Sequence, residues 1–107
     1  KAYEIALERQ PDSPVIMIIL ATAHSNQDDS ELYDIDEAIR LAEQACDLSD
    51  YRHPAYMIST AEIYYSAGKS DEAIRMAQRA LAIAQAANQA DLAAMIFDRL
   101  RQYEGGN

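Results

Sequence analysis

The chain contains one short segment twice, and this repetition constrains the fold more than any other feature. The five residues DEAIR occupy positions 36–40 and again 71–75. The two copies continue alike, as DEAIRLAEQAC and DEAIRMAQRAL. A segment that recurs every 20–50 residues is the signature of stacked supersecondary units. We therefore predict two copies of one folding unit.

Each copy has the pattern of a helix with a stripe of small residues. Alanines recur at offsets of four and three, which places them on one helical face where a second helix can approach closely. They are Ala38, Ala42 and Ala45 in the first copy and Ala73, Ala77 and Ala80 in the second. Half of the residues are apolar, with only three glycines and three prolines. This composition favours an all-α domain.

A further apolar segment precedes each copy, PVIMIILATAHS from Pro14 and PAYMISTAEIYYS from Pro54. Proline suits the first turn of a helix, so each unit is predicted to be a helical hairpin. The spacing of the prolines exceeds that of the DEAIR copies by five residues, which places an insertion in the first connection, around NQDDSELYD. In the shorter connection Gly68 suits a left-handed helix end, and Ser70 or Asp71 suits the next N-cap.

The whole chain is predicted to form six helices. Their expected ranges are 2–10, 14–26, 35–48, 54–67, 70–87 and 90–103. The last is amphipathic, with Leu92, Met95 and Leu100 at helical spacing, and Asn88 is expected to end the helix before it.

Charge excludes several classes of partner. The net charge is −9, and residues 28–50 hold nine acids against the single base Arg40. Such a surface repels nucleic acid and anionic lipid, so neither nucleic-acid binding nor membrane contact by this fragment is expected. The apolar run 15–21 is far shorter than the roughly 20 residues that cross a bilayer.

Residues that carry catalysis are sparse. Cys46 is the only cysteine, which excludes an internal disulfide and leaves the cellular compartment undetermined; we expect it to be buried. His24 and His53 are the only histidines, and no nucleophile motif or phosphate-binding glycine loop is present. We expect His24 to be a hydrogen-bonded packing residue. No enzyme activity and no cofactor are predicted.

The acidic loop has one alternative interpretation, as a calcium site. Oxygen-bearing side chains have the ligand spacing of an EF-hand loop, but Glu31 stands where the sharp turn requires glycine. The spaced residues are Asn26, Asp28, Ser30, Asp34 and Glu37, with the carbonyl of Leu32. Helix capping by Asp34 or Asp36 and a solvated loop explain these acids better, so no metal is predicted.

Together these features resemble the tetratricopeptide repeat (TPR), a family of stacked helical hairpins with a period near 34 residues. The second unit matches its small, aromatic and turn positions through Ala61, Tyr64, Gly68, Ala73, Ala77 and Ala80. The first matches through Leu20, Ala21, Ala38, Ala42 and Ala45, with His24 in place of the aromatic residue. Met17 and Met57 replace the usual large aromatic residue of the first helices, and Tyr3, Ala6 and Pro11 fit the tail of an earlier repeat.

The resemblance implies a short right-handed solenoid in one domain, 1–107. Its parts would be the second helix of a truncated repeat (1–11), a repeat with a loop insertion (14–50), a second repeat (54–87) and a capping helix (90–104). Because the chain starts at Lys1 without methionine, we expect a C-terminal fragment of a longer TPR protein. In this family the concave side is lined by first helices and commonly receives a peptide or a partner's helix.

One stripe on each first helix is distinct from the small-residue stripe and is predicted to line that groove. Its residues are Val15, Ile18 and Thr22, and Ala55, Ile58, Glu62 and Tyr65, with Ser25 at the remaining matching position. The stripe is apolar with hydroxyl groups at one end, which suits an extended or helical segment with aliphatic anchors. The alternative is that a neighbouring helix or a second copy buries these residues. No Lys or Arg lies in residues 14–25, so a basic or aliphatic partner fits better than a terminal carboxylate.

Three hypotheses for function follow. The first is a non-catalytic scaffold that binds a protein or peptide partner in the groove. The second is a homo-oligomerisation element. The third is a regulatory appendage of an enzyme that lies upstream of Lys1.

Overall fold

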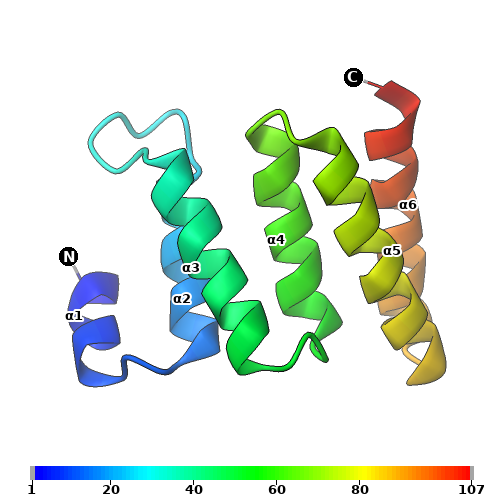
Figure 1. Cartoon of the computed structure of the whole chain (residues 1–107), viewed down its shortest axis with the longest axis horizontal. Coiled ribbons are helices and arrows are strands. Elements are labelled where there is room, and N and C mark those ends of the chain that lie inside the picture. The colour runs from blue at the N-terminus through cyan, green and yellow to red at the C-terminus, as the bar shows by residue number, and fades with distance from the viewer. Residues whose placement is uncertain (1, 107) are drawn as a thin grey trace.

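The computed structural model describes residues 2–106, which form six α-helices (Figure 1). They are α1 (Ala2–Arg9), α2 (Pro14–His24), α3 (Ile35–Leu48), α4 (Pro54–Ser66), α5 (Ser70–Ala86) and α6 (Ala90–Gly106). No strand occurs among the described residues, so the all-α prediction is confirmed. The boundaries agree with the predicted ranges within two residues, except that α6 continues to Gly106 instead of ending at residue 103.

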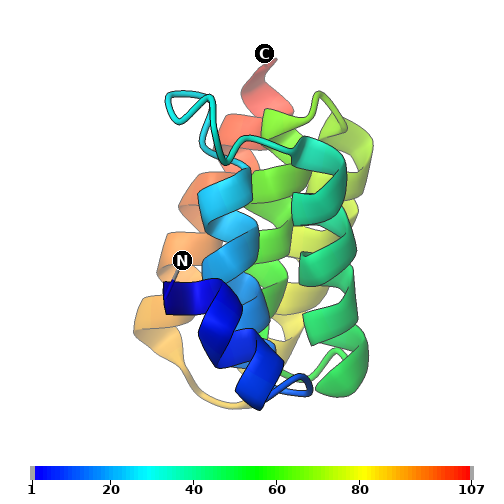
Figure 2. The same ribbon diagram turned by 90° about the vertical axis from the view of Figure 1, so that its left-hand side faces the viewer.

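The helices run alternately up and down and pack mainly against their neighbours in sequence (Figure 1). The helix α4 is central: it contacts α2, α3 and α5 along their lengths and reaches α6 through side chains. Turned by 90°, the view shows α3 on one side of α4 and α2 with α6 on the other (Figure 2). Because α4 has neighbours on nearly every side, it buries residues on different faces, such as Ile58 and Ile63.

The core is built on the predicted alanine stripes. All six stripe alanines, Ala38, Ala42, Ala45, Ala73, Ala77 and Ala80, are fully buried. One cluster of buried residues joins α2 to α3 and includes Met17, Leu41 and, from α4, Ile63. The other joins α4, α5 and α6 around Met57, Ala61 and Ile96. The side chain of Tyr3, assigned to the tail of an earlier repeat, lies outside the described residues.

Helix ends follow local rules that were partly predicted. Pro14 and Pro54 occupy first-turn positions as expected. Gly68 (φ 80°) and Asn88 (φ 59°) are left-handed residues that end α4 and α5, and Asp50 (φ 57°) does the same for α3. After each of them the next amide bonds back across the last turn, as in a Schellman motif.

The N-cap prediction for α5 was wrong. The helix already includes Ser70 and Asp71, its N-cap is Lys69, and no side chain caps it. The amide of Lys69 donates to Tyr64 O and so closes the end of α4. This tight turn also brings Lys69 directly into the N-cap position of α5. The helix itself begins at Ser70, as in the predicted range 70–87.

Residues 25–34 form the inserted connection between α2 and α3. The ring of His24 donates from Nδ1 to the carbonyl of Leu32 at 2.6 Å, which confirms it as a hydrogen-bonded packing residue. Asp34 caps α3 by accepting from the amide of Glu37 at 3.1 Å, as predicted. Asn26 and Asp29 also accept from backbone amides of the loop. Among residues 2–106 no group of three or more His, Cys, Asp or Glu side chains is placed to hold a metal ion.

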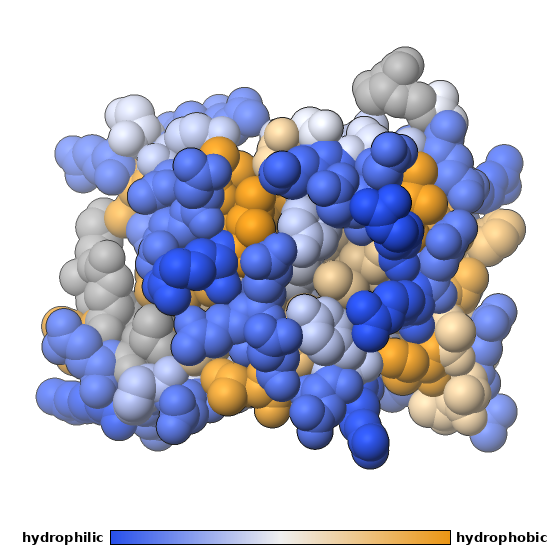
Figure 3. All heavy atoms as spheres, viewed as in Figure 1, coloured by the Kyte–Doolittle hydropathy of each residue, from blue (hydrophilic) through white to orange (hydrophobic). Residues whose placement is uncertain are grey.

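Hydrophilic residues cover most of the face formed by α3 and α5, and apolar residues emerge there in separate places rather than as one patch (Figure 3). Within the described part of the chain, every helix is too short or too polar to cross a bilayer.

Candidate functional site

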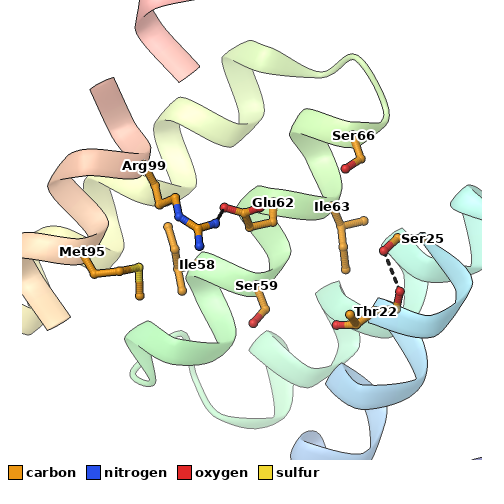
Figure 4. Close-up of a pocket in the computed structure, with 9 residues that line it drawn as sticks. All are labelled: Thr22, Ser25, Ile58, Ser59, Glu62, Ile63, Ser66, Met95 and Arg99. Atoms are coloured by element: carbon orange, nitrogen blue, oxygen red, sulfur yellow. Dashed lines mark hydrogen bonds and ion pairs between the residues drawn. The ribbon is translucent and has the colours of Figure 1, made fainter. Parts of the chain in front are cut away.

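A hollow of about 370 Å³ lies where α2, α4 and α6 meet (Figure 4). The central helix α4 supplies most of its wall, and the two flanking helices supply the edges. The lining residues are Thr22 from α2 and Ser25 at its C-cap, Ile58, Ser59, Glu62, Ile63 and Ser66 from α4, and Met95 and Arg99 from α6. Of these helices, α2 and α4 are the first helices of the two hairpins, and α6 follows the second hairpin.

Apolar groups and hydroxyl groups divide this surface. Ile58 is 6% exposed and Ile63 is also buried, so both offer only part of a side chain, whereas Met95 is 36% exposed. On the α2 edge the hydroxyls of Thr22 and Ser25 donate to carbonyls of their own helix, each at 2.8 Å. Their oxygens keep lone pairs free to accept a hydrogen bond from a bound group.

An ion pair crosses the hollow from α4 to α6 (Figure 4). Arg99 donates from Nη1 to Glu62 Oε2, and the hydroxyl of Tyr103 donates to the same oxygen at 2.8 Å. The side chain of Glu62 is 41% exposed and that of Arg99 is 40% exposed. Solvent therefore weakens the pair, and each partner remains within reach of a bound group.

Aromatic packing holds α6 against the same end of α4. The rings of Tyr65 and Tyr103 lie 4.8 Å apart with a 34° tilt. Burial raises the pKa of Tyr103 to about 12, so its hydroxyl stays protonated and able to donate to Glu62 near neutral pH.

The predicted groove residues do not all reach the hollow. Thr22, Ile58 and Glu62 line it. Tyr65 packs on Tyr103 instead. Val15 and Ala55 are exposed and Ile18 is half-buried, all nearer the N-terminal ends of α2 and α4. A neighbouring helix, α6, thus covers part of the stripe at Tyr65, while Glu62 still lines the hollow.

Sequence reasoning missed five lining residues, namely Ser59, Ile63, Ser66, Met95 and Arg99. A stripe defined by offsets of three and four is one residue wide, whereas the wall contributed by α4 is wider. Treating α6 only as a cap also removed Met95 and Arg99 from consideration. Their spacing of four residues on an amphipathic helix was the available signal.

Cys46 lies away from the hollow and is fully buried, as predicted. The Thr60 hydroxyl donates its proton to Tyr56 O at 2.9 Å. The Cys46 thiol lies 3.3 Å from Thr60 Oγ1 and is therefore the donor between these two side chains. Burial raises the pKa of the Cys46 thiol, which keeps it neutral and unreactive.

No protein-family model and no curated protein matches this chain.

Proposed function

We propose that this chain is a non-catalytic protein-binding scaffold, a short TPR-like solenoid that receives a segment of a partner protein on its α2, α4 and α6 side. Supporting the solenoid, the two alanine stripes occupy equivalent buried positions in successive hairpins. The α4 helix also packs on α2 of the preceding hairpin and contacts α6, which follows its own hairpin, through the Glu62–Arg99 pair, so each layer rests on the next.

The observation that carries the binding role is the hollow itself. It is lined by three helices of the repeated arrangement and combines an apolar wall, hydroxyl groups and one ion pair. Binding surfaces of this type pair apolar anchors with a few placed polar groups. The lining residues include no histidine or cysteine, the side chains that most often act as base or thiol nucleophile.

The test is selection of peptides from a random twelve-residue display library on the immobilised chain, followed by calorimetry with the enriched peptides. We expect Met95→Asp to weaken their binding at least tenfold, because a carboxylate replaces an exposed apolar anchor in the hollow. Leu48→Asp is the matched control, since Leu48 is a large apolar residue of similar exposure, 46%, at the end of α3. Equal losses in both variants, or no enriched peptide, would contradict the proposal.

A second candidate, self-association, is favoured by the apolar residues on the N-terminal side. Ile5 and Val15 are 50% and 49% exposed, and Ile19 is also exposed. Light scattering after size exclusion decides this point: a dimer that dissociates in the Val15→Asp variant supports self-association. Val15 is better suited to this test than Ile58, which is buried and would destabilise the fold if charged.

A further inference from the structure

The hollow is electrostatically asymmetric in a way that selects the kind of segment it can bind. Glu62 is the only Asp, Glu, Lys or Arg in α2 or α4. The opposing cation, Arg99, is on α6. The charge at the centre of the wall is therefore negative, and its cation belongs to the edge.

The hydrogen bonds show which partner of the pair is open to a ligand. Glu62 Oε2 accepts from both Arg99 and Tyr103, whereas Oε1 accepts no hydrogen bond from the described residues. A carboxylate has about four acceptor positions, so Glu62 can accept a second cation without losing Tyr103. Arg99 is a long, 40% exposed side chain at the rim, and it can turn toward solvent when another cation arrives.

The charge of the whole chain points in the same direction. At −9, the protein attracts cationic segments and repels anionic ones over several ångströms of solvent. An anionic segment seeking Arg99 would also have to approach Glu62, which already contacts that guanidinium. A cationic segment is repelled by only one residue of the lining, Arg99.

Given that the hollow binds a partner at all, we propose that its ligand is a basic amphipathic segment. An aliphatic side chain would rest on Ile58 and Met95, and a Lys or Arg would bind Glu62. Ile58 and Glu62 are one helical turn apart, about 6 Å along the axis. The partner's two residues are then spaced i and i+3 or i+4 in a helix, or i and i+2 in an extended strand.

The test uses the same display library, read for composition. We expect enriched peptides to carry Lys or Arg two to four residues from an aliphatic residue. With the most enriched peptide, Glu62→Gln should weaken binding about 5- to 20-fold, and Arg99→Gln, which removes the competing cation, should tighten it up to threefold. Glu104→Gln removes one exposed carboxylate outside the hollow and should have no effect.

The two charge variants give opposite results for the opposite ligand. If enriched peptides carry Asp or Glu and Arg99→Gln is the variant that loses binding, the hollow takes anionic segments; the basic-segment proposal is then overturned while the scaffold proposal stands. Peptides whose affinity is unchanged by Glu62→Gln and Arg99→Gln but still depends on Met95 overturn the basic-segment proposal in the same way. Failure of any peptide to depend on Met95 instead removes the proposed function itself. Thermal melts of all three variants exclude unfolding as the cause.

Discussion

The two hairpins, α2 with α3 and α4 with α5, share their buried small residues and the DEAIR segment, and they differ in the polar residues of their first helices and connections. The alanine stripes are fully buried in both, and Met17 and Met57 are nearly inaccessible at equivalent places. At these positions the neighbouring backbone leaves room only for a small side chain, or for a flexible one that fills the remaining gap. The repeated alanines therefore mark where space between the helices is most restricted.

The polar residues differ because each hairpin has different neighbours. His24 and Tyr64 stand at the same offset from Pro14 and Pro54. His24 turns to its own ten-residue connection, 25–34, and donates to Leu32 O. Tyr64 precedes the tight connection 67–69, and its hydroxyl instead reaches back to α3 and donates to Glu43 Oε2. One position thus closes a loop in one hairpin and joins two hairpins in the other.

The largest expected effect comes from substitutions in the alanine stripes that the two hairpins share. Ala42→Leu and Ala77→Leu each insert a branched side chain where no surface is exposed. We expect each to lower the free energy of unfolding by about 2–3 kcal/mol, and by similar amounts, because overpacking shifts the adjacent helix. Urea unfolding followed by circular dichroism measures both.

The control for these variants is Ala82→Leu on α5, because Ala82 is exposed. It should change stability by less than about 0.5 kcal/mol, as surface substitutions usually do. If either buried site accepted leucine as readily as Ala82 does, the two stripes would not be equivalent contact positions.

A smaller effect should break the polar contact that exists only in the second hairpin. Tyr64→Phe removes the hydroxyl that donates to Glu43 and leaves a half-buried carboxylate without that donor. We expect a loss of about 1–2 kcal/mol. Tyr33→Phe is the control, since Tyr33 is exposed in the connection 25–34. Similar losses in the two variants would show that the contact with Glu43 contributes nothing specific.

Alkaline pH should act on the same half of the molecule. Burial raises the pKa of Tyr64, and the hydrogen bond to Glu43 raises it further. Burial also raises the pKa of Tyr51 and of Tyr103 to about 12. A raised tyrosine pKa means that the neutral form is favoured by folding. Its contribution is full below the unfolded pKa near 10 and is lost as pH rises toward 12.

Stability should therefore fall between about pH 10 and 12, and less steeply in Tyr64→Phe, in which one of these groups is missing. Urea midpoints at several pH values measure the slope. All three tyrosines belong to or pack on the cluster of α4, α5 and α6, whereas the cluster of α2 and α3 contains none. Equal slopes for the wild type and the variant would contradict this assignment.

The sequence was sufficient for the helices because they depend on local signals. Proline at Pro14 and Pro54, glycine at Gly68 and the alanine periodicity each act within a turn or two of chain. Burial of the stripes also followed, because a face of small residues is of use only against another helix. The N-cap of α5 was missed because the preceding turn, not a polar side chain, supplies the residue in that position.

The hollow was harder to predict because it depends on where α6 packs. Glu62 could be assigned to the groove, but its ion pair joins residues far apart in sequence, Glu62 and Arg99. No periodic pattern encodes such a pair. The same holds for Tyr65, whose predicted exposure to a ligand is reduced by Tyr103. Helix faces are therefore readable from sequence, and the contacts that shape a site between helices are not.

The smallest expected effect sharpens the comparison by making the two connections alike. Replacing residues 27–34 with the residues 67–69 removes the insertion together with the Asp34 cap, whose loss costs about 1 kcal/mol. Shortening the connection from ten residues to five returns about 0.6 kcal/mol of closure entropy. Stability should then stay within about 1 kcal/mol of the wild type, measured by urea unfolding. The reciprocal exchange places the long loop after α4 and removes Gly68, whose left-handed conformation ends that helix, so it should cost more. A shortened chain that lost more than about 3 kcal/mol would mean that residues 27–34 position α3 against α2, and the hairpins would then be equivalent only in their alanines.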